Sequence, residues 1–185
     1  MRPVAIRAHP LVFGTIVFLA SESMLFAALL AGYYYLRALD APWPPTGTEL
    51  DFPGMALGTG LLGLGSLTMV VAQFAAERSQ RVIARIMLAI TCLAGLGFLY
   101  LELSDYYDAN YQINTNAYST MYYVITGTHF AHVCVGVVLL AMMAIYLRKP
   151  AFTRDNHAGV EAIAWYWHFV FFVWCAVYAT IFLVK

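Results

Sequence analysis

Five long apolar stretches occupy most of this chain of 185 residues, and they limit what it can fold into. They lie at about 11–36, 54–76, 82–103, 119–147 and 160–184. A helix rises about 1.5 Å per residue, so each stretch is long enough to cross a hydrocarbon core about 30 Å thick. The runs are continuous and lack the alternation of barrel strands. The sequence therefore predicts an all-α fold, a polytopic bundle of five transmembrane helices that forms one membrane domain over residues 1–185.

Composition agrees with this class and excludes others. The chain is 62% hydrophobic and 11% charged, with a mean hydropathy of +0.72, far from the values of soluble domains. A net charge of zero offers no basic surface for nucleic acid. Cys92, Cys134 and Cys175 fall inside apolar stretches without CxxC spacing, which favours buried thiols over a disulfide framework or a zinc site.

The distribution of basic residues predicts the topology. Eight of the ten Lys and Arg residues fall at the N-terminus or in the 77–85 and 148–157 connections, and only Arg37 and Lys185 fall on the opposite side. Basic residues concentrate in cytoplasmic loops. We therefore expect the N-terminus in the cytoplasm and the C-terminus outside.

The second stretch is rich in glycine. Small residues let helices approach closely in lipid, where apolar contact alone provides little association. Close helix packing is the expected use of Gly54, Gly58, Gly60, Gly63 and Gly65.

Glu22 is an ionisable residue at membrane depth. It lies about eleven residues into its stretch, near the bilayer midplane. A buried charge there is costly unless it faces protein, a partner or water. Two interpretations follow: a neutral carboxylic acid that hydrogen-bonds a neighbouring helix, or a group that handles protons or positions a lipid or partner.

His129 and His132 are three residues apart and so project from one helical face. Hydrogen bonds to another helix, with Glu22 or Glu102 as partners, are the expected use. A closed metal site needs further ligands, and the His-plus-carboxylate repeats of di-iron bundles are missing. Haem ligation needs one imidazole per axial position, so a haem role stays open on the sequence alone.

The last stretch carries Glu161 and His168, which are seven residues apart and share a helical face. Glu161 is expected near the cytoplasmic interface beside His157. Trp165 and Trp167 suit an interfacial aromatic belt, with contact to a bound phospholipid as the alternative.

At the outer end of the third stretch, Glu102 is expected to be partly embedded. Asp105 and Asp108 are expected on a solvated rim. The sequence contains no Ser/His/Asp or Cys/His arrangement, phosphate loop or catalytic carboxylate pair, so no catalytic or metal-binding residue is assigned.

Several motifs occur in a recognisable order. They are FLASESMLF (18–26), a Pro-rich WPP loop, ELSDYYDA (102–109), TGTHFAHVCVG (126–136), FTRDNHAGVEAIAWYWHFV (152–170) and VWCAVY (173–178). Together they resemble subunit III of haem–copper oxidases, in particular the bacterial aa3-type cytochrome c oxidases. The likeness covers the chain from about residue 10 onward and fits a short form that lacks the first two of seven helices.

The resemblance implies a non-catalytic core subunit that binds no cofactor itself. Haem a, haem a3 and copper are expected in the partner subunits I and II. The chain is expected to pack on subunit I, hold phospholipid and support proton uptake and complex integrity during aerobic electron transport. A small subunit IV and a cytochrome bc complex in a supercomplex are further expected partners. The expected location is the bacterial plasma membrane.

The resemblance also assigns residues. Glu22 matches the family's buried, carbodiimide-reactive glutamate, His129 and His132 match its paired histidines, and Glu161, Trp167 and His168 match its last helix. Three positions depart from the pattern. Phe171 stands where Asp is usual, Phe130 where Gly is common, and Glu102 where Gln is frequent.

Two other functions remain open at this stage. One is the equivalent subunit of a quinol oxidase or nitric-oxide reductase. The other is an independent haem or metal membrane enzyme that uses His129, His132 and His168. A proton-coupled transporter built around Glu22 is disfavoured because five helices show no repeat-related, discontinuous segments.

Overall fold

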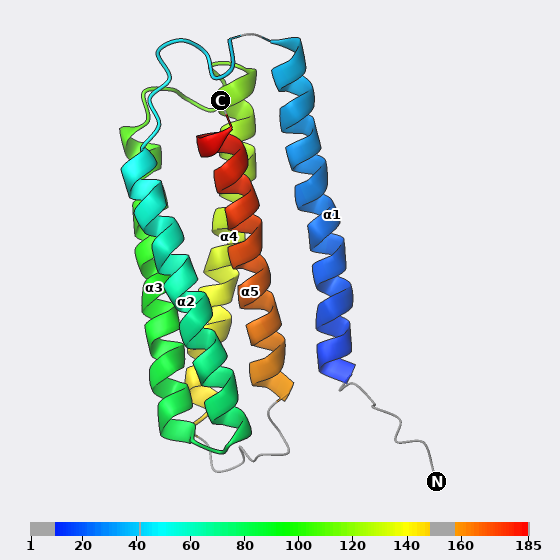
Figure 1. The fold of residues 1–185 in the computed structure, drawn as a ribbon, viewed down its shortest axis with the longest axis vertical. Coiled ribbons are helices and arrows are strands. Elements are labelled where there is room, and N and C mark those ends of the chain that lie inside the picture. Colours follow the sequence, from blue (N-terminus) through cyan, green and yellow to red (C-terminus); the bar gives the residue numbers. More distant parts are fainter. Residues whose placement is uncertain (1–9, 41, 149–157, 185) are drawn as a thin grey trace.

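The structure, a computed structural model, describes residues 10–40, 42–148 and 158–184, and these form a bundle of long helices (Figure 1). The helices are α1 (Pro10–Leu39), α2 (Phe52–Glu77), α3 (Arg81–Asp108), α4 (Ala117–Tyr146) and α5 (Ala158–Tyr178), the last continued by the π-helical turn η1 (Ala179–Leu183). Counting α5 with η1, five helices are long and apolar enough to cross a membrane. The described residues contain no strand, and the predicted all-α bundle of five spanning helices is confirmed.

Polar caps set where two of the helices begin. The Asp51 carboxylate accepts a hydrogen bond from the Gly54 amide at 3.0 Å and so caps α2. At α4, the Asn116 side chain accepts from the Ser119 amide while the Ser119 hydroxyl accepts from the Asn116 amide. This reciprocal pair satisfies backbone donors that the helix itself leaves unpaired.

The helices are not equally embedded in the bundle. α2 and α3 pack along each other, α4 and α5 complete the group, and α1 contacts α4 and α5. In Figure 1, α1 stands at one side of the other four helices. In the apolar windows of these helices, 44% of the residues are buried in the α5 segment but only 17% in α1.

Trp167 of α5 lies at the centre of the packing. Its indole is 1% exposed and rests against three glycines of three other helices, Gly65 of α2, Gly95 of α3 and Gly136 of α4. A Cβ at Gly95 would lie 2.7 Å from the indole. The expected place of Trp167 in an interfacial belt is therefore wrong, because absent side chains on three helices create a cavity that its indole fills. Trp165, two residues earlier, is 50% exposed.

Three of the five α2 glycines, Gly58, Gly63 and Gly65, pack against another helix as expected, whereas Gly54 faces only its own cap residue Asp51. A Cβ at Gly58 would lie 3.1 Å from the Phe98 ring of α3. A Cβ at Gly63 would lie 3.6 Å from Phe171 of α5, so the phenylalanine that replaces the family's aspartate packs over a glycine. Gly60 meets nothing within 4 Å.

The connection that follows α1 is compact and tied to its neighbours. The Trp43 indole packs edge-on against Tyr33 of α1 and Tyr118 of α4, with ring centroids 5.4 and 5.3 Å apart. The Asn110 side chain donates a hydrogen bond to the Gly47 carbonyl at 2.8 Å. These contacts tie the Pro-rich loop to α1, α4 and the connection between α3 and α4.

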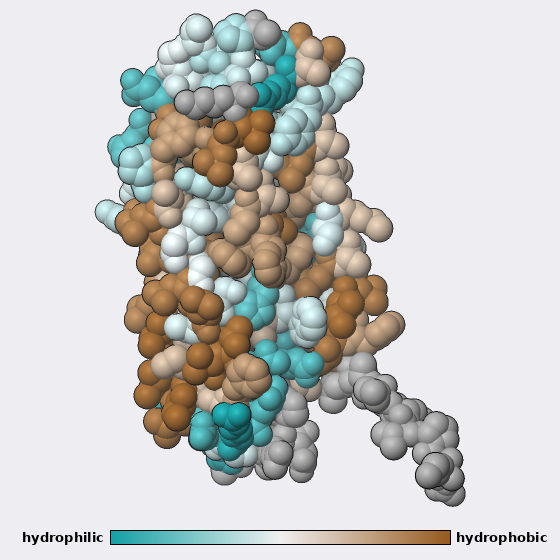
Figure 2. Space-filling view, viewed as in Figure 1, coloured by the Kyte–Doolittle hydropathy of each residue, from teal (hydrophilic) through white to brown (hydrophobic). Residues whose placement is uncertain are grey.

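The outer surface matches a membrane environment. Figure 2 shows apolar side chains over much of the face between the two ends, and hydrophilic residues gathered toward the upper and lower ends. Large exposed apolar side chains occur along the length of the helices, among them Phe13, Met24, Leu67 and Phe172. Lipid or other membrane subunits can cover such a surface without the cost that water would impose.

Candidate functional site

Glu22 of α1 and His132 of α4 form a hydrogen-bonded pair inside the apolar part of the bundle. His132 Nε2 lies 3.0 Å from Glu22 Oε2, and the two side chains are 15% and 19% exposed. This is the interhelical hydrogen bond that the sequence predicted for the histidine pair. It is also the one ion-pair contact found among the described residues.

Hydrogen-bond counting assigns one shared proton to this pair. His132 Nδ1 lies 2.7 Å from the Thr128 carbonyl, which can only accept, so Nδ1 carries a hydrogen. The 3.0 Å contact between Nε2 and Glu22 then requires one further proton. It resides either on the carboxyl, giving a neutral pair, or on Nε2, giving an ion pair. The pair can therefore hold a proton at either of two adjacent atoms.

An aromatic side chain packs against the imidazole of this pair. Phe26 of α1 packs edge-on against the His132 ring at 5.1 Å and against Phe169 of α5 at 6.4 Å. Ser21 and Ser23 donate to carbonyls of their own helix and contribute no contact to the pair. The apolar surroundings strengthen the hydrogen bond between Glu22 and His132, since the local dielectric is low.

His129 faces a different part of the bundle. It is fully buried, its Nε2 donates to the Val170 carbonyl of α5 at 3.2 Å, and its ring packs on Trp174 at 4.9 Å. The expected glutamate partner for His129 is wrong; a backbone carbonyl takes that place. The two histidines point toward α5 and α1 respectively, so they do not converge on one ligand. No group of three His, Cys, Asp or Glu side chains that could hold a metal occurs in the described part of the chain.

His168 of α5 is held by α2. Its Nδ1 lies 2.6 Å from the Ser66 hydroxyl. His168 and Glu161 line one groove of about 280 Å³, as their seven-residue spacing predicts, together with Gln73, Ala164, Trp165 and Phe172. The predicted interfacial neighbour of Glu161, His157, lies outside the described residues.

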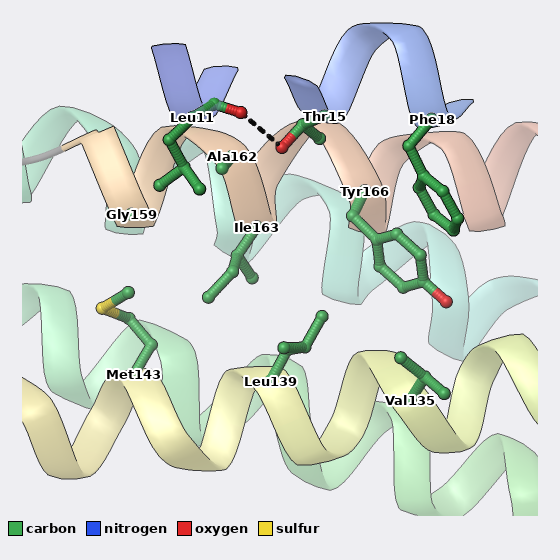
Figure 3. A pocket seen from close by; sticks show the side chains of 10 residues that line it. All are labelled: Leu11, Thr15, Phe18, Val135, Leu139, Met143, Gly159, Ala162, Ile163 and Tyr166. Carbon is green, nitrogen blue, oxygen red and sulfur yellow. Dashed lines mark hydrogen bonds between the residues drawn. The ribbon is translucent and has the colours of Figure 1, made fainter. Parts of the chain in front are cut away.

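An apolar groove of about 370 Å³ lies between α1, α4 and α5 (Figure 3). Its two hydroxyls are already satisfied, since Thr15 donates to the Leu11 carbonyl at 3.0 Å and Tyr166 to the His132 carbonyl at 2.9 Å. The groove is lined by Leu11, Thr15, Phe18, Val135, Leu139, Met143, Gly159, Ala162, Ile163 and Tyr166. Sequence reasoning missed this groove because three helices far apart in the chain create it.

A second polar cluster lies near the end of α3. Glu102 is 1% exposed and Asp105 is 7% exposed, so the expected solvated rim is wrong for Asp105. Tyr122 of α4 donates a hydrogen bond to the Asp105 carboxylate and pulls it into the interface between α3 and α4. Asp108 is exposed, as expected.

Fold and site together define the class of protein: a polytopic membrane helical bundle whose intramembrane polar groups join neighbouring helices. Comparison with known proteins gives the family. The family model for cytochrome c oxidase subunit III matches residues 4–184. The chain is 36% identical over 177 residues to cytochrome c oxidase subunit 3 of Latimeria chalumnae and to that of Danio rerio. The subunit 3 of Gadus morhua is 35% identical over the same length. In each comparison 92% of this chain aligns with 68% of the relative.

The chain therefore belongs to the cytochrome c oxidase subunit III family, and the predicted resemblance is confirmed. Membership identifies a multi-pass membrane protein that is a non-catalytic subunit of an oxidase and works in a complex with other oxidase subunits.

Proposed function

We propose that this chain is subunit III of a proton-pumping aa3-type cytochrome c oxidase in a bacterial plasma membrane. The observation that carries the proposal is the family match across residues 4–184. The alignment covers 68% of the length of the fish subunits, and the described residues include five helices that could span a membrane. The excess of basic residues in two connections and at the N-terminus supports an N-terminus in the cytoplasm.

In this proposal the chain binds no redox cofactor. Haem a, haem a3 and copper belong to subunits I and II, and this chain packs on subunit I. A small subunit IV and a cytochrome bc complex are proposed as further partners. The diverging directions of His129 and His132 support this division, because each imidazole is committed to a different neighbouring helix.

The Glu22–His132 pair is the proposed contribution to proton uptake. It holds one proton between two adjacent atoms inside the membrane-spanning part of the bundle. Exchange between the neutral and the ionised pair moves that proton without leaving an uncompensated charge, which membrane depth would penalise. The pair therefore suits a role in sustaining proton supply over many turnovers.

The groove between α1, α4 and α5 is the proposed binding site for a phospholipid acyl chain. Its hydroxyls are engaged with backbone carbonyls, so it presents an apolar wall to a hydrocarbon chain. An acyl chain there would fill the groove beside α1, the helix with the smallest buried fraction, and so help keep α1 attached to the bundle.

The first experiment purifies the chain through a C-terminal tag in mild detergent and records the reduced-minus-oxidised spectrum. Haem a absorbance with a copper-bearing second subunit is expected. Partners that lack the dinuclear copper subunit would indicate a quinol oxidase or nitric-oxide reductase. Stoichiometric haem or iron on this chain alone would overturn the proposal in favour of an independent membrane enzyme.

The role of the carboxyl is tested by Glu22→Ala in the assembled complex. Initial oxygen reduction is expected to match wild type, while proton uptake falls and activity decays over fewer turnovers. Ser21→Ala, one residue earlier, is the control because its hydroxyl bonds only its own helix. If Glu22→Ala equals wild type in uptake, lipid content and durability, Glu22 is a packing residue.

The groove is tested by filling it. Leu139→Trp places a large ring among the lining residues, and the complex is expected to retain less phospholipid by mass spectrometry. Val138→Trp is the matched control, since Val138 is 56% exposed and does not line the groove. Equal lipid content in both variants would contradict an acyl chain at this position.

A further inference from the structure

Glu102 is a carboxyl group that the proposed function does not use. It lies six residues before the end of α3 at Asp108, about 9 Å inside the helix end. It is 1% exposed, and no cation forms an ion pair with it among the described residues. Its Oε2 has no hydrogen-bond partner in the part of the chain that the structure describes.

The hydroxyl chain beside Glu102 indicates where its proton lies. Thr126 of α4 donates to the Tyr122 carbonyl at 2.7 Å, which leaves its oxygen free to accept. The Tyr106 hydroxyl lies 2.8 Å from Thr126 Oγ1 and 3.1 Å from Glu102 Oε1. A tyrosine has one hydroxyl hydrogen. If Tyr106 donates that hydrogen to Thr126 Oγ1, the nearer oxygen, it has none left for Glu102. The contact between the Tyr106 hydroxyl and Glu102 Oε1 is then a hydrogen bond only if Glu102 is protonated and acts as the donor.

The free-energy cost of burying a charge also indicates that Glu102 is neutral. An ionised carboxylate at this position would have one hydroxyl as its donor and one oxygen without any, in a region without a compensating cation. Burying such a charge is far more costly than burying a neutral acid. In the neutral form Oε1 donates to Tyr106, and Oε2 is a carbonyl oxygen in apolar surroundings.

Asp105 is the carboxyl that follows Glu102 along α3 toward the loop end of the bundle. It lies one turn from Glu102 toward the end of α3, and Tyr122, whose carbonyl receives the Thr126 hydroxyl, donates its own hydroxyl to Asp105. Two acidic groups, Asp51 at the start of α2 and Asp108, lie close enough to interact with Asp105.

The remaining titratable neighbours of the two carboxyls are weak acids. They are Tyr106, Tyr111, Tyr122 and Tyr123 around Asp105 and Cys134 near Glu102. Burial, with the nearby Asp105 charge, raises the pKa of Tyr111 in the connection between α3 and α4, so it stays neutral. Tyr106 and Tyr122 hydrogen-bond the two carboxyls, and none of the five neighbours supplies a positive charge.

We propose that Glu102 is a second proton-binding site of this chain, separate from the Glu22–His132 pair, that is neutral at rest and exchanges its proton with the loop end of the bundle through Asp105. The site is carried by Glu102, Tyr106 and Thr126. It lies between α3 and α4, whereas Glu22 and His132 join α1 to α4. The proposal does not depend on the electron donor of the complex or on the role of Glu22.

Infrared spectroscopy of the purified complex tests this site, because a protonated carboxyl has a carbonyl band separate from that of a carboxylate. Glu102→Gln keeps the shape of the side chain, and the difference spectrum is expected to show the loss of one carboxylic acid band. The band is expected at the high-frequency end of its range, since Oε2 accepts no hydrogen bond, and to shift down in D2O. Asp105→Asn is expected to slow that shift several-fold, and Glu49→Gln, an exposed carboxyl in the loop between α1 and α2, to leave it unchanged.

Three outcomes would overturn the proposal: no acid band lost in Glu102→Gln, a band that never shifts in D2O, or an unchanged exchange rate in Asp105→Asn. If Glu102→Gln fails to assemble, Glu102→Asp keeps an acid at this position. The acid band is then expected to change frequency because the shorter side chain alters its hydrogen bond to Tyr106, and a spectrum identical to wild type would overturn the proposal.

Discussion

The helix interface around Trp167 and the helix interface around Glu22 are held together by different means. In the first, α2, α3 and α4 each place a glycine against one indole of α5. In the second, α1 buries a narrow stripe of side chains that recur every seven residues. One hydrogen-bonded pair, Glu22 with His132, joins α1 to α4. The stripe consists of Val12, Leu19, Phe26 and Tyr33.

The difference shows what holds helices together in lipid. Hydrocarbon solvates an exposed leucine as well as a neighbouring helix does, so attraction comes from close packing and from hydrogen bonds. Helices α2 to α5 are held together mainly by close packing. α1 has fewer buried side chains and depends more on the Glu22–His132 bond, as well as on Arg37, which donates to the Val184 carbonyl at 2.9 Å.

The largest effect is expected from Trp167→Ala, which empties the space between three glycines. Truncation of a buried Trp costs about 3–5 kcal/mol in soluble cores, and we expect the lower part of that range here because lipid also solvates the unfolded helices. Denaturant titration of the complex in detergent measures it. Trp165→Ala on the same helix is the matched control, since that indole is 50% exposed. Similar losses in both variants would contradict a central role for Trp167.

A smaller loss is expected from Gly95→Ala. The added methyl group would lie 2.7 Å from Trp167 and 2.8 Å from Val137, and the indole is enclosed on several sides. Overpacking of this kind costs about 1–3 kcal/mol. Gly60→Ala in α2 is the control because its Cβ meets nothing within 4 Å. A Gly95→Ala complex as stable as the Gly60→Ala complex would show that α3 can shift away from α5.

The smallest effect is expected at the interface between α1 and α4. A double-mutant cycle of Glu22→Gln and His132→Ala isolates the coupling between these side chains, for which we expect about 0.5–1.5 kcal/mol by comparison with other intramembrane hydrogen bonds. Protease sensitivity of the loop after α1 is the second readout, since loosening should act there first. A coupling as large as the Trp167→Ala loss would reverse the comparison and make the polar pair the main attachment of α1.

Some of the site could be read from the sequence, and some could not. The bond between His132 and Glu22 was predictable because a buried carboxyl and a buried imidazole both need partners, and few others are available. The burial of Asp105 was missed, since its position near a helix end suggests solvent. Tyr122 of α4, 17 residues away, reaches it and draws it inside. Trp167 was misplaced for a similar reason, because its cavity is created by residues of three other helices.

By itself the sequence determined the class of fold, the number of spanning helices and the family. Those follow from local properties, namely the length and apolarity of each stretch and the order of the motifs. Only the tertiary structure decided which polar groups share a proton, which tryptophan lies at the centre and where the groove opens. Helix rotation and pairing decide these features, and both depend on the fit of side chains between distant segments, such as the indole of Trp167 against Gly65, Gly95 and Gly136.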